Sequence, residues 1–400
     1  MIDYKLYSSV SELPENWDAL SHNDVFLKKA FLRALEHSCP KNITPTYAGV
    51  FKAEMLVGIL IIQRVEMYLE DIFRNANDTY FIRKSKQIFS NAVKGNALIV
   101  GSIMHTGQHG LYFKKEAINY QEYLQQLSLV IDKIKSQIKQ NHKKKIRLIA
   151  FKDYFEEDAI HDNEVFFKNE KLYKVQVQPN MVFNILDSWK TLEDYTAAFT
   201  KKYRDRYKSA RKKRTKIEKR ELDVVTLNIL QDKMFQLYKN VSDNARVNTF
   251  ILSNNHFVTL KKELKNNFKV FGYFIDKELV GFFTLILNNK SLETYFLGYN
   301  HKHQQQYQMY LNMLFDMAQF GIENNFSQIV YARTAMEIKS SIGAKPKPMS
   351  IYIKHTNFIA NAMLKLIFKY LNPDTNWVER HPFKTEKTSS ENLRFYTYYL

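Results

Sequence analysis

The alternation of apolar and polar positions predicts two β-hairpins, one in each half of the chain. The segments YAGVFKAEMLVGILII at 47–62 and FGYFIDKELVGFFTLI at 271–286 both carry aromatic and β-branched residues on either side of a short polar turn. This pattern is typical of two antiparallel strands joined by a tight turn. Aligned without gaps, the segments place Gly49 on Gly272, a shift of 223 positions, and repeat the triplet Leu-Val-Gly. A second match in the same order is needed before this indicates a duplication.

The second match is a helical stripe of apolar residues, followed by a strand, after each hairpin. Residues 122–139 carry such a stripe and precede the strand IRLIAF at 146, and residues 310–324 precede the strand QIVYAR at 328. The repeated order predicts an internal duplication of a mixed α/β unit. The strands are offset by 182 positions rather than 223, so the first half holds about 41 extra residues. We assign them to an inserted helical segment near 63–92.

The length of the chain also favours two domains, because 400 residues exceed one ordinary hydrophobic core. We place the domains at 1–185 and 186–400. Just after this boundary Thr191 and Asp194 have the spacing of a helix capping box. Neither Gly nor Pro follows as far as residue 220, so we expect one long helix through 201–220 with aromatic residues along one face.

Positive charge is concentrated in that expected helix. The chain has a net charge of +18, and 201–220 alone holds 12 Lys or Arg against Asp205 and Glu218, a net charge of +10. Such a concentration favours an anionic partner, which could be an acidic carrier protein, a CoA or nucleotide phosphate, tRNA or an anionic lipid surface. The alternative is a solvated helix face. The candidate anion-binding residues are Arg211, Lys212 and Arg214.

Composition excludes several other classes of protein. No segment reaches the roughly 18 uncharged apolar residues of a membrane span, and the start MIDYKLYSSV lacks the pattern of a secretory signal. Cys39 is the only cysteine, which rules out an internal disulfide and a thiolate zinc cluster. We therefore expect a cytoplasmic protein without a transmembrane segment. No P-loop, dinucleotide-binding glycine motif, HExxH motif or nucleophile elbow is found.

Four further segments carry a resemblance to a known family. They read NDVFLKKAFLRALEHS at 23–38, GSIMHTGQHGLYF at 101–113, TKKYRDRYKSARKK at 200–213 and VYARTAMEIKSSIGAKP at 330–346. With the hairpins, and in this order, they resemble the GNAT-like acyltransferase superfamily, in particular its double-domain FemABX-like branch. The resemblance implies an α/β (α+β) fold of two tandem GNAT-like domains, each a mixed, mostly antiparallel sheet flanked by helices. It also implies transfer of an acyl or aminoacyl group from an activated donor to an amine.

The chain departs from this family where acetyl-CoA enzymes bind the pyrophosphate. Those enzymes have a glycine-rich turn there, which lets backbone N–H groups approach the phosphates. Here the segment at 298–310 reads GYNHKHQQQYQMY, with no glycine after Gly298. We expect a thioester donor, acyl-CoA or an acyl carrier protein, no permanently bound cofactor, and an amine acceptor. The alternatives are aminoacyl transfer from tRNA to a cell-envelope precursor, and a non-catalytic RNA- or membrane-binding protein.

Candidate catalytic residues follow the strands LETYFLGY and VYART of the second half. Parallel neighbouring strands open a cleft at their carboxyl ends, so Tyr299 and His301 are expected to face Arg333 and Glu337. The cleft is expected between the domains and mainly on the second. Glu337 or His301 would be the base, Tyr299 the acid or oxyanion donor, and Arg333 an anion anchor. Lys339 could bind substrate; alternatively, Glu337 and Lys339 are a surface charge pair.

Two more residues are candidates for substrate binding. His109 lies in HTGQHG, whose glycines allow a tight loop, and Arg246 could hold a carboxylate or phosphate through two hydrogen bonds. A structural salt bridge is the alternative for Arg246 and for Arg333. Because His105 and His109 have no third ligand in view, we expect no metal site.

Overall fold

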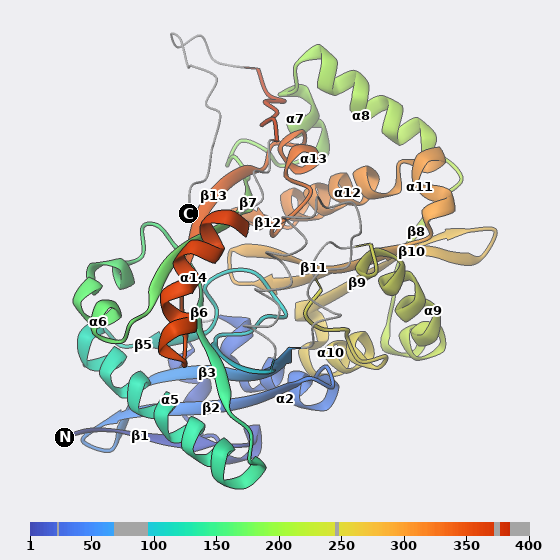
Figure 1. The fold of residues 1–400 in the computed structure, drawn as a ribbon. Helices are drawn as coiled ribbons and strands as arrows, with labels where there is room; N and C mark the ends of the chain where they lie inside the picture. The colour runs from blue at the N-terminus through green and yellow to red at the C-terminus, as the bar shows by residue number, and fades with distance from the viewer. Residues whose placement is uncertain (22–23, 68–94, 245–247, 372–376, 385–400) are drawn as a thin grey trace.

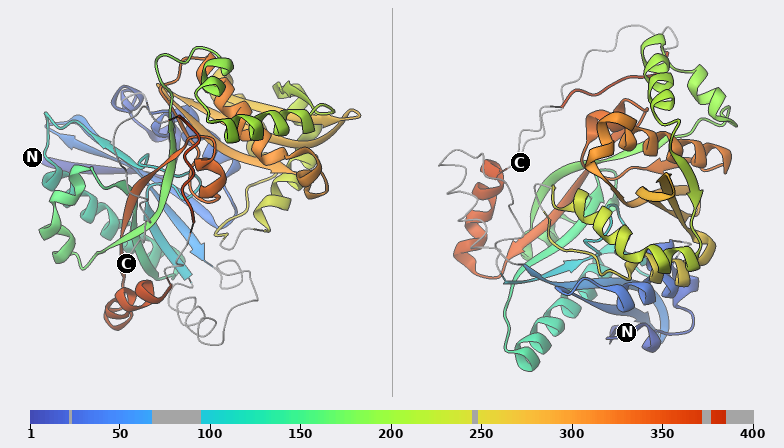
Figure 2. Two further views of the ribbon diagram at one scale, coloured as in Figure 1. Left: turned by 90° about the horizontal axis from the view of Figure 1, so that it is seen from above. Right: turned by 90° about the vertical axis from the view of Figure 1, so that its right-hand side faces the viewer.

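The computed structural model describes residues 1–21, 24–67, 95–244, 248–371 and 377–384. These residues form one twisted sheet of 13 strands with helices on both faces (Figure 1, Figure 2). The strands are β1 (Ile2–Tyr7), β2 (Ile43–Lys52), β3 (Met55–Met67), β4 (Gly95–Val100), β5 (Leu111–Phe113), β6 (Ile146–Phe155), β7 (Tyr173–Asn184), β8 (Glu218–Glu221), β9 (Phe268–Ile275), β10 (Glu278–Asn288), β11 (Ser291–Tyr299), β12 (Gln328–Val330) and β13 (Lys345–His355). The helices are α1 (Trp17–Leu20), α2 (Lys29–Ser38), α5 (Tyr120–His142), α6 (Glu164–Asn169), α7 (Leu192–Ala197), α8 (Lys201–Lys213), α9 (Val224–Ser242), α10 (His256–Leu264), α11 (His301–Tyr307), α12 (Met309–Glu323), α13 (Met336–Ser340) and α14 (Phe358–Leu371).

The strand order confirms the predicted duplication. The sheet runs β1-β2-β3-β4-β6-β13-β7-β12-β11-β10-β9-β8, so β1-β2-β3-β4-β6 at one end mirrors β8-β9-β10-β11-β12 at the other. The two predicted hairpins, β2–β3 and β9–β10, occupy equivalent places. The two helices predicted after them, α5 and α12, each connect a pair of parallel strands.

The two hairpins also agree in their local geometry. Ala53 and Glu54 have φ values of 48° and 66°, and Asp276 and Lys277 have values of 48° and 68°. Two consecutive left-handed residues define the turn that matches the twist of a two-residue hairpin. A Cβ on either Gly49 or Gly272 would meet one phenylalanine and one leucine of its own hairpin at 2.8–3.0 Å. The same two kinds of side chain therefore pack over the glycine in both copies.

The middle of the sheet belongs to both halves. Strand β13, near the end of the chain, lies between β6 and β7 and is antiparallel to both. On its other edge β7 pairs with β12. The boundary at residue 185 stays a prediction, since β7 and β13 complete the sheet of each half.

The helices bury one face of the sheet in a layer that joins the halves. On this face α2 of the first half packs beside α9 and α10 of the second, and Arg33 pairs with Glu263 at 3.1 Å. On the opposite face α5 covers the first half, while α7, α8 and α12 cover the second. Within the described residues, none of the helices combines the length and apolarity needed to cross a bilayer.

The expected helix through 201–220 begins where it was predicted but ends early. Phe199 and Thr200 separate α7 from α8, and α8 ends at Lys213. The chain turns through 214–217 and then forms β8, which pairs with β9. The backbone of β9 offers hydrogen bonds to 218–221 that a helical pattern does not reveal, and these extend the sheet instead. The predicted capping box of Thr191 and Asp194 is confirmed.

The inserted segment is also partly corrected. Residues 63–67 continue strand β3, and the rest of the segment, 68–92, lies outside the described residues. Some of the extra length lies elsewhere, in a loop at 101–110 between β4 and β5. This loop lies where the second half has the single continuous strand β11.

Two of the three candidate anion-binding residues face inward. Arg211 and Arg214 donate to the carboxylate of Asp316 on α12 at 2.7 and 2.6 Å, and Lys219 lies 3.8 Å from it. The hydroxyl of Tyr273 donates to the same carboxylate at 2.5 Å. Burial alone would raise the pKa of Asp316, but the two arginines and the lysine hold it below its usual value. Arg211 and Arg214 therefore fasten α8 to α12.

Only Lys212 of the three candidates points to solvent. It is exposed on α8, together with Lys208 and Lys213. The predicted role of Arg211 and Arg214 is corrected on this ground, because a buried carboxylate already neutralises part of their charge.

We expect Asp316→Ala to lower the free energy of unfolding by about 3 kcal/mol, because it removes the buried carboxylate that pairs with three partly buried cations. Asp205→Ala, an exposed aspartate on α8 itself, should change it by less than about 0.5 kcal/mol. Urea denaturation of both variants measures the difference.

The pH dependence gives the same test a second readout. Since folding lowers the pKa of Asp316, its stabilisation is present at neutral pH and is lost as the pH falls through the folded-state value. Wild type and the Asp316 variant should converge in stability in acid. Equal stability at pH 7 would contradict this role.

Candidate active site

Two parallel strands of the second half separate and leave a gap. β11 and β12 pair from Ser291 with Gln328 to Glu293 with Val330 and no further. β11 continues to Tyr299, while the chain after β12 follows β7, since Tyr331 donates to the carbonyl of Met181 at 2.8 Å. Within the part of the chain that the structure describes, the second half of β11 therefore has no paired strand on this side.

A β-bulge on β11 shapes the side chains at the gap. Phe283 of β10 is opposite Leu297, and Leu285 is opposite Thr294, so one β10 residue faces two β11 residues. The extra residue lies at Tyr295 and Phe296. Bulges increase twist and re-aim side chains, and they occur often next to active sites.

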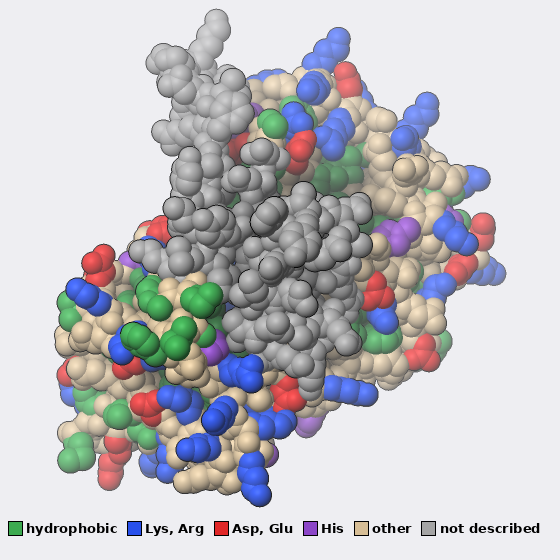
Figure 3. Space-filling view, viewed as in Figure 1, with side chains coloured by type: hydrophobic (Ala, Val, Ile, Leu, Met, Phe, Trp, Pro, Cys, Tyr) green, Lys and Arg blue, Asp and Glu red, His purple; other side chains and the backbone are tan. Residues whose placement is uncertain are grey.

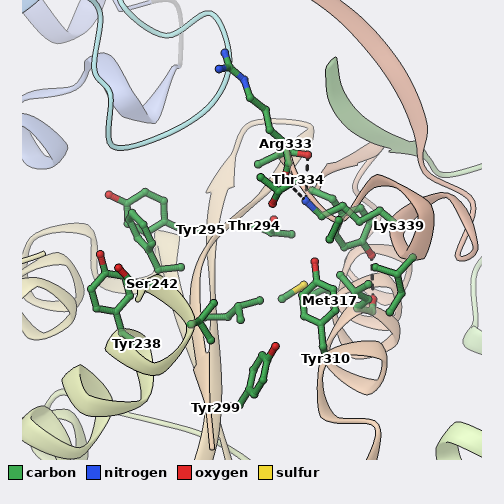
Figure 4. A pocket seen from close by; sticks show the side chains of 18 of the residues that line it. Tyr238, Ser242, Thr294, Tyr295, Tyr299, Tyr310, Met317, Arg333, Thr334 and Lys339 are labelled. Carbon is green, nitrogen blue, oxygen red and sulfur yellow. Dashed lines mark hydrogen bonds between the residues drawn. The ribbon is translucent and has the colours of Figure 1, made fainter. Parts of the chain in front are cut away.

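The gap contains a cavity of about 510 Å³ (Figure 4). Its walls come from α9, from β11, from α12, and from the loop and short helix that follow β12. Polar side chains in these walls include Tyr238, Ser242, Thr294, Tyr295, Tyr299, Tyr310, Arg333 and Lys339. All the lining residues belong to the second half. This cavity therefore does not lie between the two expected domains, and the catalytic role of the second half stays a prediction.

Lys339 carries the buried amine at this cavity. Its Nζ donates to the carbonyl oxygens of Arg333 at 2.6 Å and Ala332 at 3.2 Å, and the side chain is almost fully buried. Burial lowers the pKa of Lys339 to about 7. A neutral amine uses its two hydrogens on these two carbonyls, which leaves the lone pair for a proton from another molecule. The lysine is thus able to act as a base near neutral pH.

Tyrosine hydroxyls line the other side of the cavity. Figure 4 shows the hydroxyl of Tyr310 directed from α12 toward the region of Lys339, with Tyr299 beside it. The two rings lie 6.5 Å apart, and burial raises the pKa of both phenols. Both therefore stay protonated at neutral pH and can donate hydrogen bonds to a developing oxyanion.

Tyr295 is held in place by a buried histidine. The Ser38 hydroxyl donates to the carbonyl of Ala34 at 2.6 Å, so it accepts from His256 Nδ1 at 3.0 Å. Burial lowers the pKa of His256 to about 4, which keeps the ring neutral. Its Nε2 then accepts the proton of the Tyr295 hydroxyl at 3.2 Å. This chain connects α2 of the first half to the cavity wall.

The first half has the equivalent gap, but a loop fills it. Lys152 of β6 donates to the carbonyl of His105 at 2.6 Å, and Asp153 accepts from the backbone of Gly107 at 3.1 Å. Asp153 is fully buried and pairs with Lys152 and with Arg333. Loop 101–110 is therefore anchored between the halves, which leaves the second-half gap open.

His109 lies in this loop and is a structural residue in this arrangement. Its Nδ1 lies 2.8 Å from Asp24, and its ring packs on Phe26. Burial lowers the pKa of His109, but Asp24 and then Glu293 raise it above its ordinary value. Burial also raises the pKa of Glu293 to about 7. His109 does not line the cavity beside β11. Its substrate-binding role stays a prediction.

The structure brings together three of the sequence-predicted residues, Tyr299, Arg333 and Lys339. All three line the cavity, but Figure 4 shows the Arg333 side chain extending away from the tyrosines, and its guanidinium pairs with Asp153. Burial lowers the pKa of Arg333 to about 10. Arg333 is thus the structural salt-bridge partner that the sequence left as the alternative.

The predicted places of Glu337 and His301 in the cleft are wrong. Glu337 pairs with Arg380, and 51% of its side chain is exposed. Residues two apart on a helix face nearly opposite ways, so α13 turns Glu337 outward when it buries Lys339. His301 is exposed at the start of α11 and bonds the carbonyl of Asn240 at 2.7 Å. Arg246 lies outside the described residues.

Sequence reasoning missed Tyr310, Ser242 and Thr294. Tyr310 adjoins the apolar stripe of its helix and lies two positions after the polar run QQQYQ, which was its only signal. Ser242 and Thr294 gave no signal, because a long-range bulge and helix packing place them.

In the described parts of the chain, the starts of α12 and α5 already have side-chain hydrogen-bond partners within the chain. The backbone N–H of Tyr310, in the first turn of α12, donates to Gln304 of α11 at 3.0 Å. The start of α5 is closed by a capping box of Asn119 and Glu122, whose carboxylate would repel phosphate. Among the described residues no group of three His, Cys, Asp or Glu side chains is placed to hold a metal ion.

Solved structures share this fold. A tandem GNAT protein from the clavulanic acid biosynthesis pathway, solved without AcCoA, aligns with a TM-score of 0.52 at 10% identity, over 89% of this chain and 99% of its own. FemX aligns with a TM-score of 0.49 at 9% identity, over 87% and 96%. A conserved protein of unknown function from Bacteroides thetaiotaomicron aligns with a TM-score of 0.48 at 9% identity, over 88% and 99%. No family model and no curated protein sequence matches the chain. The predicted tandem GNAT-like fold is confirmed.

We expect Gly298→Ala to damage this site, because an added Cβ would meet the backbone of Leu237 and Tyr238 at 2.5 Å. α9 must then move away from β11, and it carries Tyr238 and Ser242 of the cavity wall. The cost should be about 1–3 kcal/mol of stability or more. Thermal unfolding checks this against Ile229→Ala, an exposed position on α9, which should be neutral. Equal melting temperatures would contradict the close packing of α9 on β11.

Proposed function

We propose that this chain is an acyltransferase that moves an acyl or aminoacyl group from an activated donor to an amine, in the cavity beside β11. The observation that carries this proposal is the buried Lys339 amine in the wall of a cavity between two separating parallel strands. The tandem GNAT-like fold agrees with this class of reaction. Fold alone does not decide function, so the proposal depends on the site.

The proposed reaction needs a base, a site for the oxyanion and a shaped cavity. Lys339 takes a proton from the acceptor ammonium, and the freed amine attacks the donor carbonyl. Tyr299 and Tyr310 donate to the oxygen as it becomes negative. The new C–N bond forms and the C–S bond of a thioester breaks. Lys339 gives the proton it took from the ammonium to the leaving thiolate, then takes the second proton from the new amide nitrogen and releases it to water.

The cavity favours an acyl group larger than acetyl. About 510 Å³ is the size of pocket that takes a drug-sized ligand, and an acetyl group would leave most of it empty. The aromatic rings in its wall favour an apolar or aromatic acyl or aminoacyl group. The closed starts of α5 and α12 disfavour the usual pyrophosphate contacts, so an acyl carrier protein suits the site better than CoA.

The exposed lysines of α8 support an anionic carrier for the donor. Lys208, Lys212 and Lys213 face solvent, while α8 is fastened through Asp316 to α12. α12 lies between α8 and the cavity, since its Tyr310 and Met317 line the cavity. α8 would therefore hold the carrier rather than the acyl group. Aminoacyl-tRNA is the second candidate donor, because the same lysines would contact phosphates.

We expect the rate of amine acylation to rise as the pH increases through about 7, because Lys339 is an effective base only when neutral. Lys339→Met should lower kcat about 10²–10⁴-fold and abolish this pH dependence. The measurement is product formation by mass spectrometry from acyl thioesters of graded acyl size with a panel of amines.

The matched control is Glu337→Gln, which changes an exposed carboxylate on the same short helix. It should keep the rate of the wild type. If Glu337→Gln loses activity and Lys339→Met keeps it, the base proposed here is wrong and the sequence-based assignment stands.

The carrier surface has a separate test. Lys208→Glu with Lys212→Glu should weaken binding of an acyl carrier protein or tRNA and reduce its salt dependence, while small thioester donors react unchanged. Fluorescence anisotropy at increasing salt measures this. Binding that ignores both salt and charge reversal would leave α8 as a solvated face.

A further inference from the structure

The first turns of α14 present apolar side chains to solvent. Phe358, Ile359 and Met363 are 72%, 71% and 45% exposed. They lie on one side of the helix, while Asn361 and Leu364 on the other side are buried. Helices of globular proteins normally bury their apolar stripe, so an exposed one on a fixed helix marks an interaction surface.

The helix is fixed in this orientation by polar anchors. Asn361 accepts from the backbone of His355 at 2.7 Å and donates to the carbonyl of Lys171 at 3.1 Å. Thr356 bonds the carbonyls of Ile146 and Arg147 at the start of β6, both at 2.8 Å. The outward side chains therefore keep their place on the surface.

Basic side chains surround these apolar ones. Lys171 Nζ lies 5.4 Å from the centre of the Phe358 ring. Lys143, Lys145 and Arg147 are exposed in the segment that Thr356 contacts. Figure 3 shows hydrophobic side chains gathered over α14 with lysines and arginines beside them.

The acidic side chains beside this surface are already paired. Glu170 pairs with Lys354 at 2.6 Å, and Glu66 pairs with Lys144 at 2.5 Å. The surface as a whole is therefore apolar with a positive border.

We propose that this surface, Phe358, Ile359 and Met363 with Lys143, Lys145, Arg147 and Lys171, binds the face of an anionic lipid bilayer. The three apolar side chains enter the boundary between headgroups and acyl chains. The basic side chains contact the headgroup phosphates, and the long lysines reach them while their stems cover the apolar ring. The protein lies on the membrane and does not span it. An acidic protein partner or a second copy of the chain is the competing occupant.

The test is flotation of the full chain with vesicles of phosphatidylcholine alone, or of phosphatidylcholine and phosphatidylglycerol in equal parts. We expect binding to the anionic vesicles only. Phe358→Ser with Ile359→Ser should weaken it at least about tenfold, because two exposed apolar side chains no longer enter the bilayer. Arg147→Glu with Lys171→Glu should also weaken vesicle binding, and the loss should be larger at low salt than at high salt.

Ile229→Ser is the matched control, an equally exposed apolar residue on α9, and it should bind as the wild type does. Thermal unfolding establishes that each variant is folded. The proposal is overturned if the chain ignores anionic vesicles, or if the α14 variant binds them normally. A dimer in solution that the α14 variant dissociates would overturn it in favour of a second copy.

Discussion

The pairing of β13 with β6 and β7 is the constraint on which the rest of the molecule depends. It makes one sheet from two similar halves and ties the last part of the chain to the first. On the other edge of β7, its pairing with β12 draws the chain after β12 along β7 and away from β11. The cavity is a consequence, because β11 loses its neighbour just where its bulge turns Tyr295 and Phe296.

The two duplicated halves have equivalent gaps between strands, but the gaps differ in whether a loop fills them. In the first half the strand that corresponds to β11 is interrupted by loop 101–110, and the buried charges of Lys152, Asp153 and Arg333 hold this loop in place. In the second half the strand is continuous, and no segment among the described residues fills the gap. Burying a charge is costly unless it is paired, so this network is a strong constraint on how the halves meet.

The basic residues of this chain differ in role according to the groups that they contact. On α8 the inner arginines hold the helix to a buried aspartate, and only the outer lysines remain for an anionic partner. Beside α14 the lysines border exposed apolar side chains, which is the combination suited to a lipid surface. The buried Lys339 amine bonds two backbone carbonyls, and its burial lowers its pKa to about 7.

The sequence by itself determined the duplication, the hairpins, the paired helices and the class of fold, because hydrophobic periodicity and turn residues are local and recur at a fixed offset. It also singled out Tyr299 and Lys339, which line the cavity, although their roles stay predictions. It could not place Glu337 and His301, since one helical step decides which side chain is buried, and it could not see that the β9 edge would take up residues 218–221. Three features join residues far apart in the chain: the position of β13 between β6 and β7, the bulge on β11, and the buried partners of Arg211 and Arg333. Only tertiary packing decides such contacts, because their energy depends on which groups are excluded from water together.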